Sequence, residues 1–291
     1  MIQRLLKWGA PAGLVSALAM TFMVSPLANA ATTAVQCSDL STAVTTAVAG
    51  DTLNVTGNCT LTGSILVDKQ LTINGVNEAT ISTSGSTQLF TITAAGTIIQ
   101  NLNFVKTDKA NQIIIGVQAN NVSVLDNTFK GMYLLSENDH TSRALVVSPG
   151  VTDVTISRNT FENLRQPAYI NDFVTGTVSD NYVDQTRGFV VVANSDVTFT
   201  GNSWGTNALD IAIIPGAPNN YTCEVVRQIV RDNNNADVQN QAQVTPCPAP
   251  TYPKNKDACK NEAYKSFTGV EFKNQGQCVS YVASNGKSNN R

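Results

Sequence analysis

A short signature recurs about every 22 residues in the middle of the chain, and it constrains the fold more than any other feature. In each copy, alternating apolar and small polar residues lead to an asparagine, and another apolar residue follows two positions later. A fixed period in this range marks one supersecondary unit stacked on copies of itself, and the alternation is that of strands. We therefore predict an all-β solenoid of short strands with corners at Asn127, Asn159, Asn181 and Asn202.

The N-terminus has the pattern of a secretory signal peptide. Two basic residues precede an apolar run over 8–27, which ends in Ala28-Asn29-Ala30, a small-x-small cleavage pattern. Glycines and prolines interrupt the run, which argues against a retained membrane anchor. We predict a signal peptide at 1–30 and a secreted, extracellular or cell-surface protein with no stable membrane span after cleavage.

The six cysteines all follow the predicted cleavage site. An even number in an oxidising compartment indicates disulfides. A zinc site is not supported, because no Cys-x-x-Cys occurs and the single histidine, His140, is far from every cysteine in sequence. The cysteines fall into three local pairs, and we predict the bridges Cys37–Cys59, Cys223–Cys247 and Cys259–Cys278.

The charge of the mature chain is uneven. Without the signal peptide it has 17 Lys and Arg against 21 Asp and Glu, and seven of the basic residues but only three of the acidic ones follow Pro253. A nucleic-acid-binding protein would need a clustered basic face, which an acidic body with a mildly basic tail does not provide. We expect a monomer that does not bind nucleic acid.

Two further segments of the body stand out. Ser38 is expected to cap a short helix that ends near Gly50, and such a helix would cover the exposed apolar end of the first coil. The spacing from Asn127 to Asn159 is 32 residues, which places an insertion of about ten residues at 130–139. Insertions in repeat folds form loops on one side, often the side that binds.

The repeats resemble those of the pectate lyase superfamily. The resemblance covers about 36–247 and includes Gly50-Asp51-Thr52-Leu53 and Leu71-Thr72-Ile73-Asn74-Gly75 before the asparagine repeats of the PbH1 type. It implies a single-stranded right-handed parallel β-helix, in which the corner asparagines stack into a ladder of side-chain amides. It does not imply one function, because this fold hosts lyases, hydrolases, adhesins and non-enzymatic surface proteins.

The end of the chain is expected to form a separate unit. Prolines follow the body closely, so we predict a linker at 248–258 and a small module at 259–291. A module of this size cannot bury a large core, so its disulfide should carry its stability. It is similar to a two-cysteine element appended to many bacterial secreted proteins, on Cys259-Lys260-Asn261 and Phe272-Lys273-Asn274-Gln275-Gly276-Gln277-Cys278-Val279.

Three arginines repeat with the period of the coils. Arg143, Arg165 and Arg187 are each 22 residues apart, so they are expected on one edge of adjacent coils. One interpretation is an alternating salt ladder on a solvated face, which would contribute little per pair. The other is a strip that recognises a polyanion such as a uronate-containing polysaccharide, because guanidinium groups bind carboxylates bidentately. The potential partners, each three residues before an arginine, are His140, Glu162 and Asp184.

Catalytic motifs of the family are incomplete here. A hydrolase that resembles this family would bring paired carboxylates together as acid and base. Here Asn171-Asp172 is not an acidic pair, and Asp139-His140-Thr141 lacks flanking glycines. A lyase would need aspartates holding Ca²⁺ beside an arginine base, and the acidic cluster is missing. If the protein were a lyase, Arg165 would be the base and Ca²⁺ the cofactor; otherwise we expect no cofactor.

The sequence thus favours a secreted β-helix that binds a polysaccharide or cell-surface glycan without catalysis. The alternatives are a polysaccharide lyase or glycoside hydrolase of the same fold, and a structural envelope protein. Aromatic residues would form either a sugar-stacking platform or part of the core. They are Tyr133, Tyr169, Phe173, Tyr182, Phe189 and Trp204.

Overall fold

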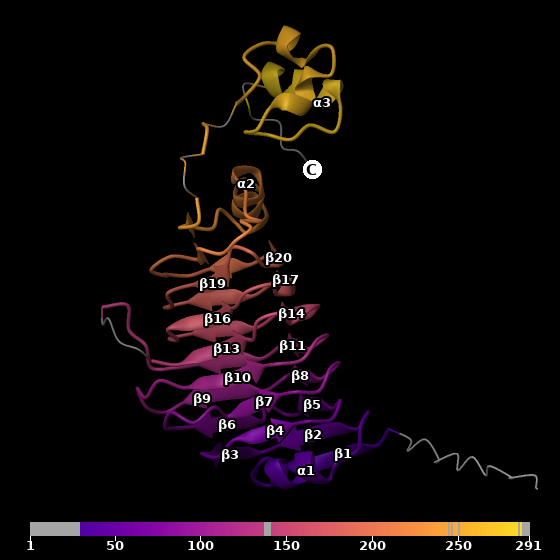
Figure 1. The fold of residues 1–291 in the computed structure, drawn as a ribbon, viewed down its shortest axis with the longest axis vertical. Coiled ribbons are helices and arrows are strands. Elements are labelled where there is room, and N and C mark those ends of the chain that lie inside the picture. Colours follow the sequence, from indigo (N-terminus) through magenta and orange to yellow (C-terminus); the bar gives the residue numbers. More distant parts are fainter. Residues whose placement is uncertain are drawn as a thin grey trace, which may run out of the picture.

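The computed structural model describes residues 30–136, 141–243, 245, 247–249, 251–284 and 286. Residues 1–29 of the predicted signal peptide and His140 lie outside the described residues. The body is a stack of short coils, one above another along its long axis (Figure 1). Three sheets of eight, eight and seven strands run the length of this stack. The predicted all-β parallel solenoid is confirmed.

Each coil contributes one strand to each sheet. Sheet A contains β1 (Thr32–Gln36), β2 (Thr52–Thr56), β5 (Thr72–Gly75), β8 (Ile98–Gln100), β11 (Ser123–Leu125), β14 (Val154–Ser157), β17 (Thr175–Ser179) and β20 (Asp196–Thr200). Sheet B contains β3 (Asn58–Leu61), β6 (Thr80–Thr83), β9 (Asn103–Lys106), β12 (Thr128–Lys130), β15 (Thr160–Glu162), β18 (Tyr182–Asp184) and β21 (Ser203–Trp204). Sheet C contains β4 (Ile65–Val67), β7 (Phe90–Ile92), β10 (Ile113–Val117), β13 (Arg143–Val147), β16 (Gln166–Ile170), β19 (Phe189–Val192), β22 (Ile211–Ile214) and β23 (Val238–Asn240).

The core lies inside the coils, where every second strand residue points inward. A column of phenylalanines fills its centre: the Phe129 ring is stacked between Phe104, at 4.9 Å, and Phe161, at 5.2 Å between centroids. All three side chains are fully buried. Burial of one such side chain stabilises the fold by about 1.5–3 kcal/mol, so the stacking of coils supplies the stability that a single coil lacks.

The predicted asparagine ladder is present at the corner between sheets A and B. The Nδ2 of Asn127 donates to Oδ1 of Asn159 at 3.2 Å, Asn159 donates to Asn181 at 3.1 Å, and Asn181 donates to Asn202 at 2.9 Å. Each Oδ1 also accepts a backbone N–H from the coil before it. These buried amides satisfy polar backbone groups at a bend that excludes water. Asn202 in turn donates to Asn233 at 2.7 Å, a rung that the repeat signature does not include.

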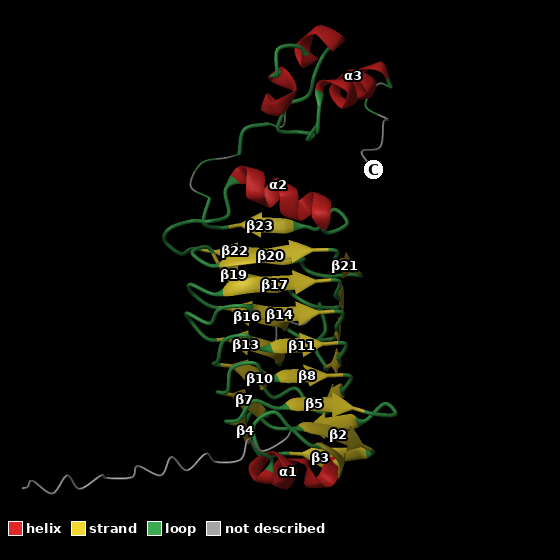
Figure 2. Ribbon diagram, turned by 90° about the vertical axis from the view of Figure 1, so that its right-hand side faces the viewer, coloured by secondary structure: helices red, strands yellow, loops and turns green. Residues whose placement is uncertain are grey.

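Helices cover both ends of the solenoid (Figure 2). At the first coil, η1 (Cys37–Asp39) leads into α1 (Leu40–Thr46), which buries Leu40 and Val44. The predicted boundaries are wrong: Ser38 lies within η1, Asp39 occupies the N-cap position without a side-chain bond, and the helix ends before Gly50. Asp51 explains the early end, because its carboxylate accepts the N–H of Val48 at 2.9 Å and holds the chain out of helical geometry.

At the last coil, α2 (Cys223–Asp232) lies across the end of the stack (Figure 2). Thr222 caps it, since its side chain accepts the N–H of Val225. Ile229 is buried against the core. No helix among the described residues is long and apolar enough to span a membrane.

The three disulfides are those predicted from sequence. Cα separations are 5.5 Å for Cys37–Cys59, 5.5 Å for Cys223–Cys247 and 5.7 Å for Cys259–Cys278. The third bridge lies in the C-terminal segment, within a small core of its own that also buries Phe272. That segment contains η2 (Lys256–Cys259), η3 (Ala263–Ser266) and α3 (Gln275–Ala283).

Candidate functional site

The three repeated arginines lie at the corner where the chain passes from sheet B to sheet C. Arg143 begins β13, Arg165 directly precedes β16, and Arg187 lies two residues before β19. Strands β13 and β16 pair with an offset of 23 residues, so Arg143 faces Gln166 and not Arg165. Arg187 then donates its backbone N–H to the Arg165 carbonyl at 3.0 Å. The arginines share an edge but not one column.

Arg143 is held by two neighbours in the next coil. Its Nε donates to Oε1 of Gln166 at 2.6 Å, and its guanidinium carbon lies 5.7 Å from the centroid of the Tyr169 ring. Burial, and secondarily the charge of Arg165, lower the pKa of Arg143. The guanidinium therefore has a fixed position in a partly desolvated setting, next to a second positive charge.

One buried atom of the Arg165 side chain has no hydrogen-bond partner. This atom is the Nε, which lacks an acceptor. Such unsatisfied donors are rare in folded proteins and need an explanation. Like charges also repel each other, and, after burial, the charge of Arg165 is one of the causes that lower the pKa of Arg143. The corner thus presents unneutralised positive charge and at least one unused donor.

The alternating salt ladder is not formed by the two acidic residues that the structure describes. Glu162 pairs instead with Lys130 at 3.5 Å, and Asp184 accepts the backbone N–H of Thr206 at 2.7 Å. Within the described ranges, no carboxylate forms an ion pair with Arg143, Arg165 or Arg187. The third proposed partner, His140, is outside the described residues.

The predicted insertion adjoins this corner. β12 ends at Lys130, and the following loop runs beside the coil that carries Arg165. Tyr133 donates its backbone N–H to the Asn163 carbonyl at 2.8 Å, and the Asn163 side chain returns a bond to the Tyr133 carbonyl at 3.2 Å. The inserted loop therefore forms part of the surroundings of Arg165.

The aromatic residues do not form one platform. Tyr133 and Phe189 are buried, and Trp204 donates its Nε1 to the Asn233 carbonyl at 2.7 Å. Phe173 and Tyr182 are exposed, but Tyr182 belongs to β18 in sheet B, whereas Phe173 lies between β16 and β17. The Tyr169 ring lies beside Arg143, one of the three arginines.

A calcium site of the lyase type does not fit the residues that the structure describes. In the described part of the chain, no group of three or more His, Cys, Asp or Glu side chains is placed to hold a metal ion. Asp210 is the buried carboxylate closest in sequence to Arg187, and it accepts from Asn207 at 3.0 Å and from the Asp237 N–H at 2.8 Å. Burial raises the pKa of Asp210. Its carboxylate thus joins the local turn at Asn207 to the segment at Asp237.

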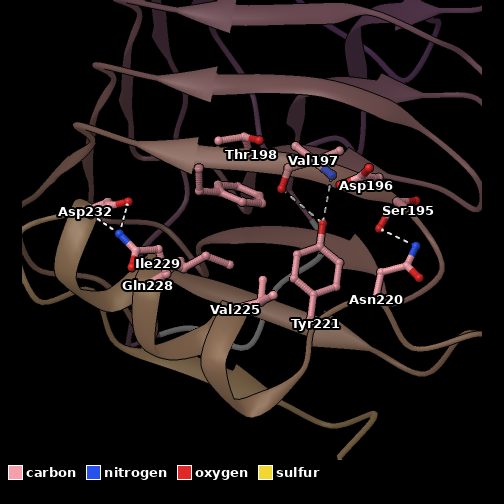
Figure 3. Close-up of a pocket in the computed structure, with 11 residues that line it drawn as sticks. Ser195, Asp196, Val197, Thr198, Asn220, Tyr221, Val225, Gln228, Ile229 and Asp232 are labelled. Carbon is pink, nitrogen blue, oxygen red and sulfur yellow. Dashed lines mark hydrogen bonds between the residues drawn. The ribbon is translucent and has the colours of Figure 1, made fainter. Parts of the chain in front are cut away.

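A second candidate site lies between β20 and α2 (Figure 3). This pocket has a volume of about 220 Å³. The Tyr221 hydroxyl accepts the N–H of Val197 at 3.3 Å and donates to the Val197 carbonyl at 3.4 Å. Burial, with a further contribution from the charge of Asp196, raises the pKa of Tyr221. On the helix, Gln228 donates to the Asp232 carboxylate at 2.7 Å.

Sequence reasoning missed this pocket because it did not predict α2. Two signals were available: Thr222 as an N-cap, and Val226, Ile229 and Val230 at helical spacing. These two helix signals cover few residues compared with the β repeats. They indicate a pocket only when the open edge of the last coil is known.

Comparison with models of known protein families and with curated protein sequences gives no match for this chain. The proposed function therefore rests on the fold and on the geometry of the two sites. The first site offers unneutralised cations, and the second offers a partly open pocket beside a strand edge.

Proposed function

We propose that the protein is a non-catalytic carbohydrate-binding protein, secreted or displayed at the cell surface, and that it recognises acidic glycans through Arg143 and Arg165. The observation that carries this proposal is the pair of guanidinium groups on adjacent coils, for which the described residues supply no neutralising carboxylate. Guanidinium groups bind carboxylates through two parallel hydrogen bonds. A uronate residue would supply the missing negative charge.

The neighbours of the arginine pair suit a sugar ligand. Tyr169 presents an aromatic ring beside Arg143, and aromatic rings pack against the apolar faces of sugar rings. Gln166 fixes the Arg143 side chain before any ligand arrives, which lowers the entropy cost of binding. Arg187 lies on the next coil and would meet a further unit of a long polyanion.

The wider assignment is part of the same proposal. We infer a right-handed solenoid of the pectate lyase superfamily with PbH1-type repeats, since parallel strands joined by crossovers are right-handed in almost all known cases. Secretion after signal cleavage agrees with three disulfides, which persist in oxidising compartments. The small C-terminal module would then be an appended unit of the type found in bacterial secreted proteins.

Two alternatives make different demands. A polysaccharide lyase would use Arg165 as its base and would need acidic side chains around a calcium ion, which the described corner does not offer. A structural envelope protein would need no ligand at all. Neither explains the unneutralised charge of Arg143 and Arg165 as directly as a bound carboxylate does.

The test is a titration of the mature chain with an oligogalacturonate and with the methyl ester of the same oligomer. We expect the acid to bind and the ester to bind at least about tenfold more weakly, because esterification removes the charge. Replacing Arg165 by Ala should weaken binding of the acid by about 1–3 kcal/mol. Arg158→Ala is the matched control, because Arg158 already pairs with Asp126 at 2.7 Å at another corner.

Three outcomes would reject the proposal. Equal binding of acid and ester would remove the role of charge, and an unchanged affinity of Arg165→Ala would remove this site. Formation of an unsaturated product, seen as ultraviolet absorbance in the presence of Ca²⁺, would identify a lyase instead.

A further inference from the structure

Strand β20 ends sheet A, so one of its edges faces α2 and not another strand. The opposite edge pairs with β17: the Asp196 N–H donates to the Val174 carbonyl at 2.8 Å, and the Thr200 carbonyl accepts from Asp180 at 3.1 Å. Successive residues of a strand direct their backbone groups to alternate sides. The outward side of β20 therefore carries the N–H groups of Val197 and Phe199, and the N–H of Gly201 directly follows the strand.

Two of these three donors are used. Val197 donates to the Tyr221 hydroxyl at 3.3 Å, and Gly201 donates to the Asp232 carbonyl at 2.7 Å. The Phe199 carbonyl accepts from Asn233 at 2.8 Å, but its N–H has no acceptor among the residues that the structure describes. Phe199 is only 2% exposed. A backbone N–H at the end of a sheet needs an acceptor, and beside a pocket a ligand or water can supply it.

Phe199, which carries this unused donor, is one of the residues that line the pocket of Figure 3. Tyr221, Val225 and Ile229 give it apolar walls, and Figure 3 shows Val225 and Tyr221 on the same side of the space. Its volume is about 220 Å³. A cavity of about 150 Å³ holds one benzene molecule, so this space fits a single six-membered ring with substituents and not a chain.

The charges at the pocket select against anions. Asp196 and Asp232 both line it, and no basic side chain does. Carboxylates repel acidic ligands but accept hydrogen bonds from hydroxyl groups. A neutral sugar ring combines apolar faces for Tyr221 and Ile229, hydroxyl donors for the carboxylates, and an oxygen acceptor for the Phe199 N–H.

We propose that the pocket between β20 and α2 binds one neutral sugar ring, and that the Phe199 N–H donates a hydrogen bond to it. This site is separate from the arginine pair and would take the opposite kind of ligand. The protein would then recognise an acidic segment and a neutral sugar residue at two places on one solenoid.

The test follows the backbone amides of the mature chain by NMR during titration with methyl glycosides of glucose, galactose, mannose and N-acetylglucosamine. We expect one of them to shift the Phe199 amide resonance in a saturable way, together with resonances of Val225 and Ile229. Methyl galacturonate should cause no saturable shift there. If none of the glycosides shifts the Phe199 amide up to the solubility limit, the pocket holds water only and the proposal is wrong.

Two tryptophan variants on α2 separate the pocket from general effects. Val225→Trp places an indole at the lining of the pocket, whereas Val230→Trp introduces the same side chain at a different surface of the helix. We expect at least about tenfold weaker binding in the first variant and unchanged binding in the second. Equal affinities in both would overturn the assignment of this pocket. The Arg165→Ala chain should bind the glycoside normally, so this proposal can fail without affecting the acidic-glycan proposal.

Discussion

The Nε of Arg143 donates to Oε1 of Gln166 at 2.6 Å, across two adjacent coils. A neutral amide therefore stands where a carboxylate would neutralise the arginine pair. Gln166 is 8% exposed, and its amide is nearly isosteric with a glutamate side chain. This contact offers a direct way to supply the missing anion from within the protein.

Replacing Gln166 by Glu should stabilise the fold and block the proposed glycan site. A carboxylate beside Arg143 would form a charge-assisted bond and raise the free energy of unfolding by about 1 kcal/mol. Affinity for oligogalacturonate should fall at least about tenfold, because the internal carboxylate competes with the ligand. Thermal unfolding and calorimetric titration measure both effects. Tighter binding of the acidic glycan by this variant would contradict the assignment of Arg143.

The asparagine ladder should be strongly coupled to stability. Asn181 donates to Asn202 at 2.9 Å and to the Ile156 carbonyl at 3.0 Å, and its Oδ1 accepts two bonds from Asn159. Asn181→Ala leaves these buried groups unpaired, so we expect a loss of about 2–4 kcal/mol in urea unfolding.

The matched control for the ladder is Asn171→Ala. Asn171 makes one side-chain bond, at 2.7 Å to the Val147 carbonyl, in a partly buried position. Its loss should cost about 1 kcal/mol. Similar costs for the two variants would show that the ladder contributes no more than an ordinary turn.

The repeat signature predicts the ladder because Asn127, Asn159 and Asn181 each follow a strand at the same distance. It does not predict Asn233, because that rung follows a helix and has no repeat around it. The register of the arginines is missed for a related reason. Spacing along the chain is 22 residues, but β13 and β16 pair with an offset of 23, and only the backbone pairing reveals that Gln166 stands opposite Arg143.

The disulfides could be predicted from sequence because each closes a short loop between neighbouring elements. The pocket at α2 could not, since it depends on which donors of β20 remain unpaired. The used donors bond to Tyr221 and Asp232, which are distant in sequence from Val197 in β20 and from Gly201 just after it. Local patterns therefore predict the coils, whereas contacts at the end of the stack need the structure.

Asp51 should make stability depend on pH in the acid range. Its carboxylate accepts the N–H groups of Ala31 at 2.8 Å and Val48 at 2.9 Å, and these bonds lower the pKa of Asp51. A lowered pKa in the folded state stabilises the fold above the ordinary pKa of an aspartate. This contribution is lost as the pH falls below about 4 and through the folded-state value.

The variant Asp51→Asn removes the titrating group. We expect lower stability at neutral pH and a flatter dependence of the melting temperature on pH in the acid range, measured by circular dichroism. The control is Asp39→Asn, an acidic residue of the same cap whose side chain makes no capping bond to α1. An unchanged acid profile in Asp51→Asn would contradict the role given to these two backbone bonds.

The last disulfide should stabilise only the C-terminal segment. Cys259 and Cys278 are fully buried in a small core with Phe272, separate from the core of the solenoid. Replacing both cysteines by Ser should remove hydrogen-exchange protection from 256–283 and leave the solenoid strands protected, because a unit of this size depends on its bridge. The equivalent double variant of Cys37 and Cys59 should instead lower the stability of the solenoid by about 2–4 kcal/mol, because that bridge joins the N-terminal cap to β3. Loss of protection spreading from the C-terminal segment into α2 and β20 would show that the two parts unfold together.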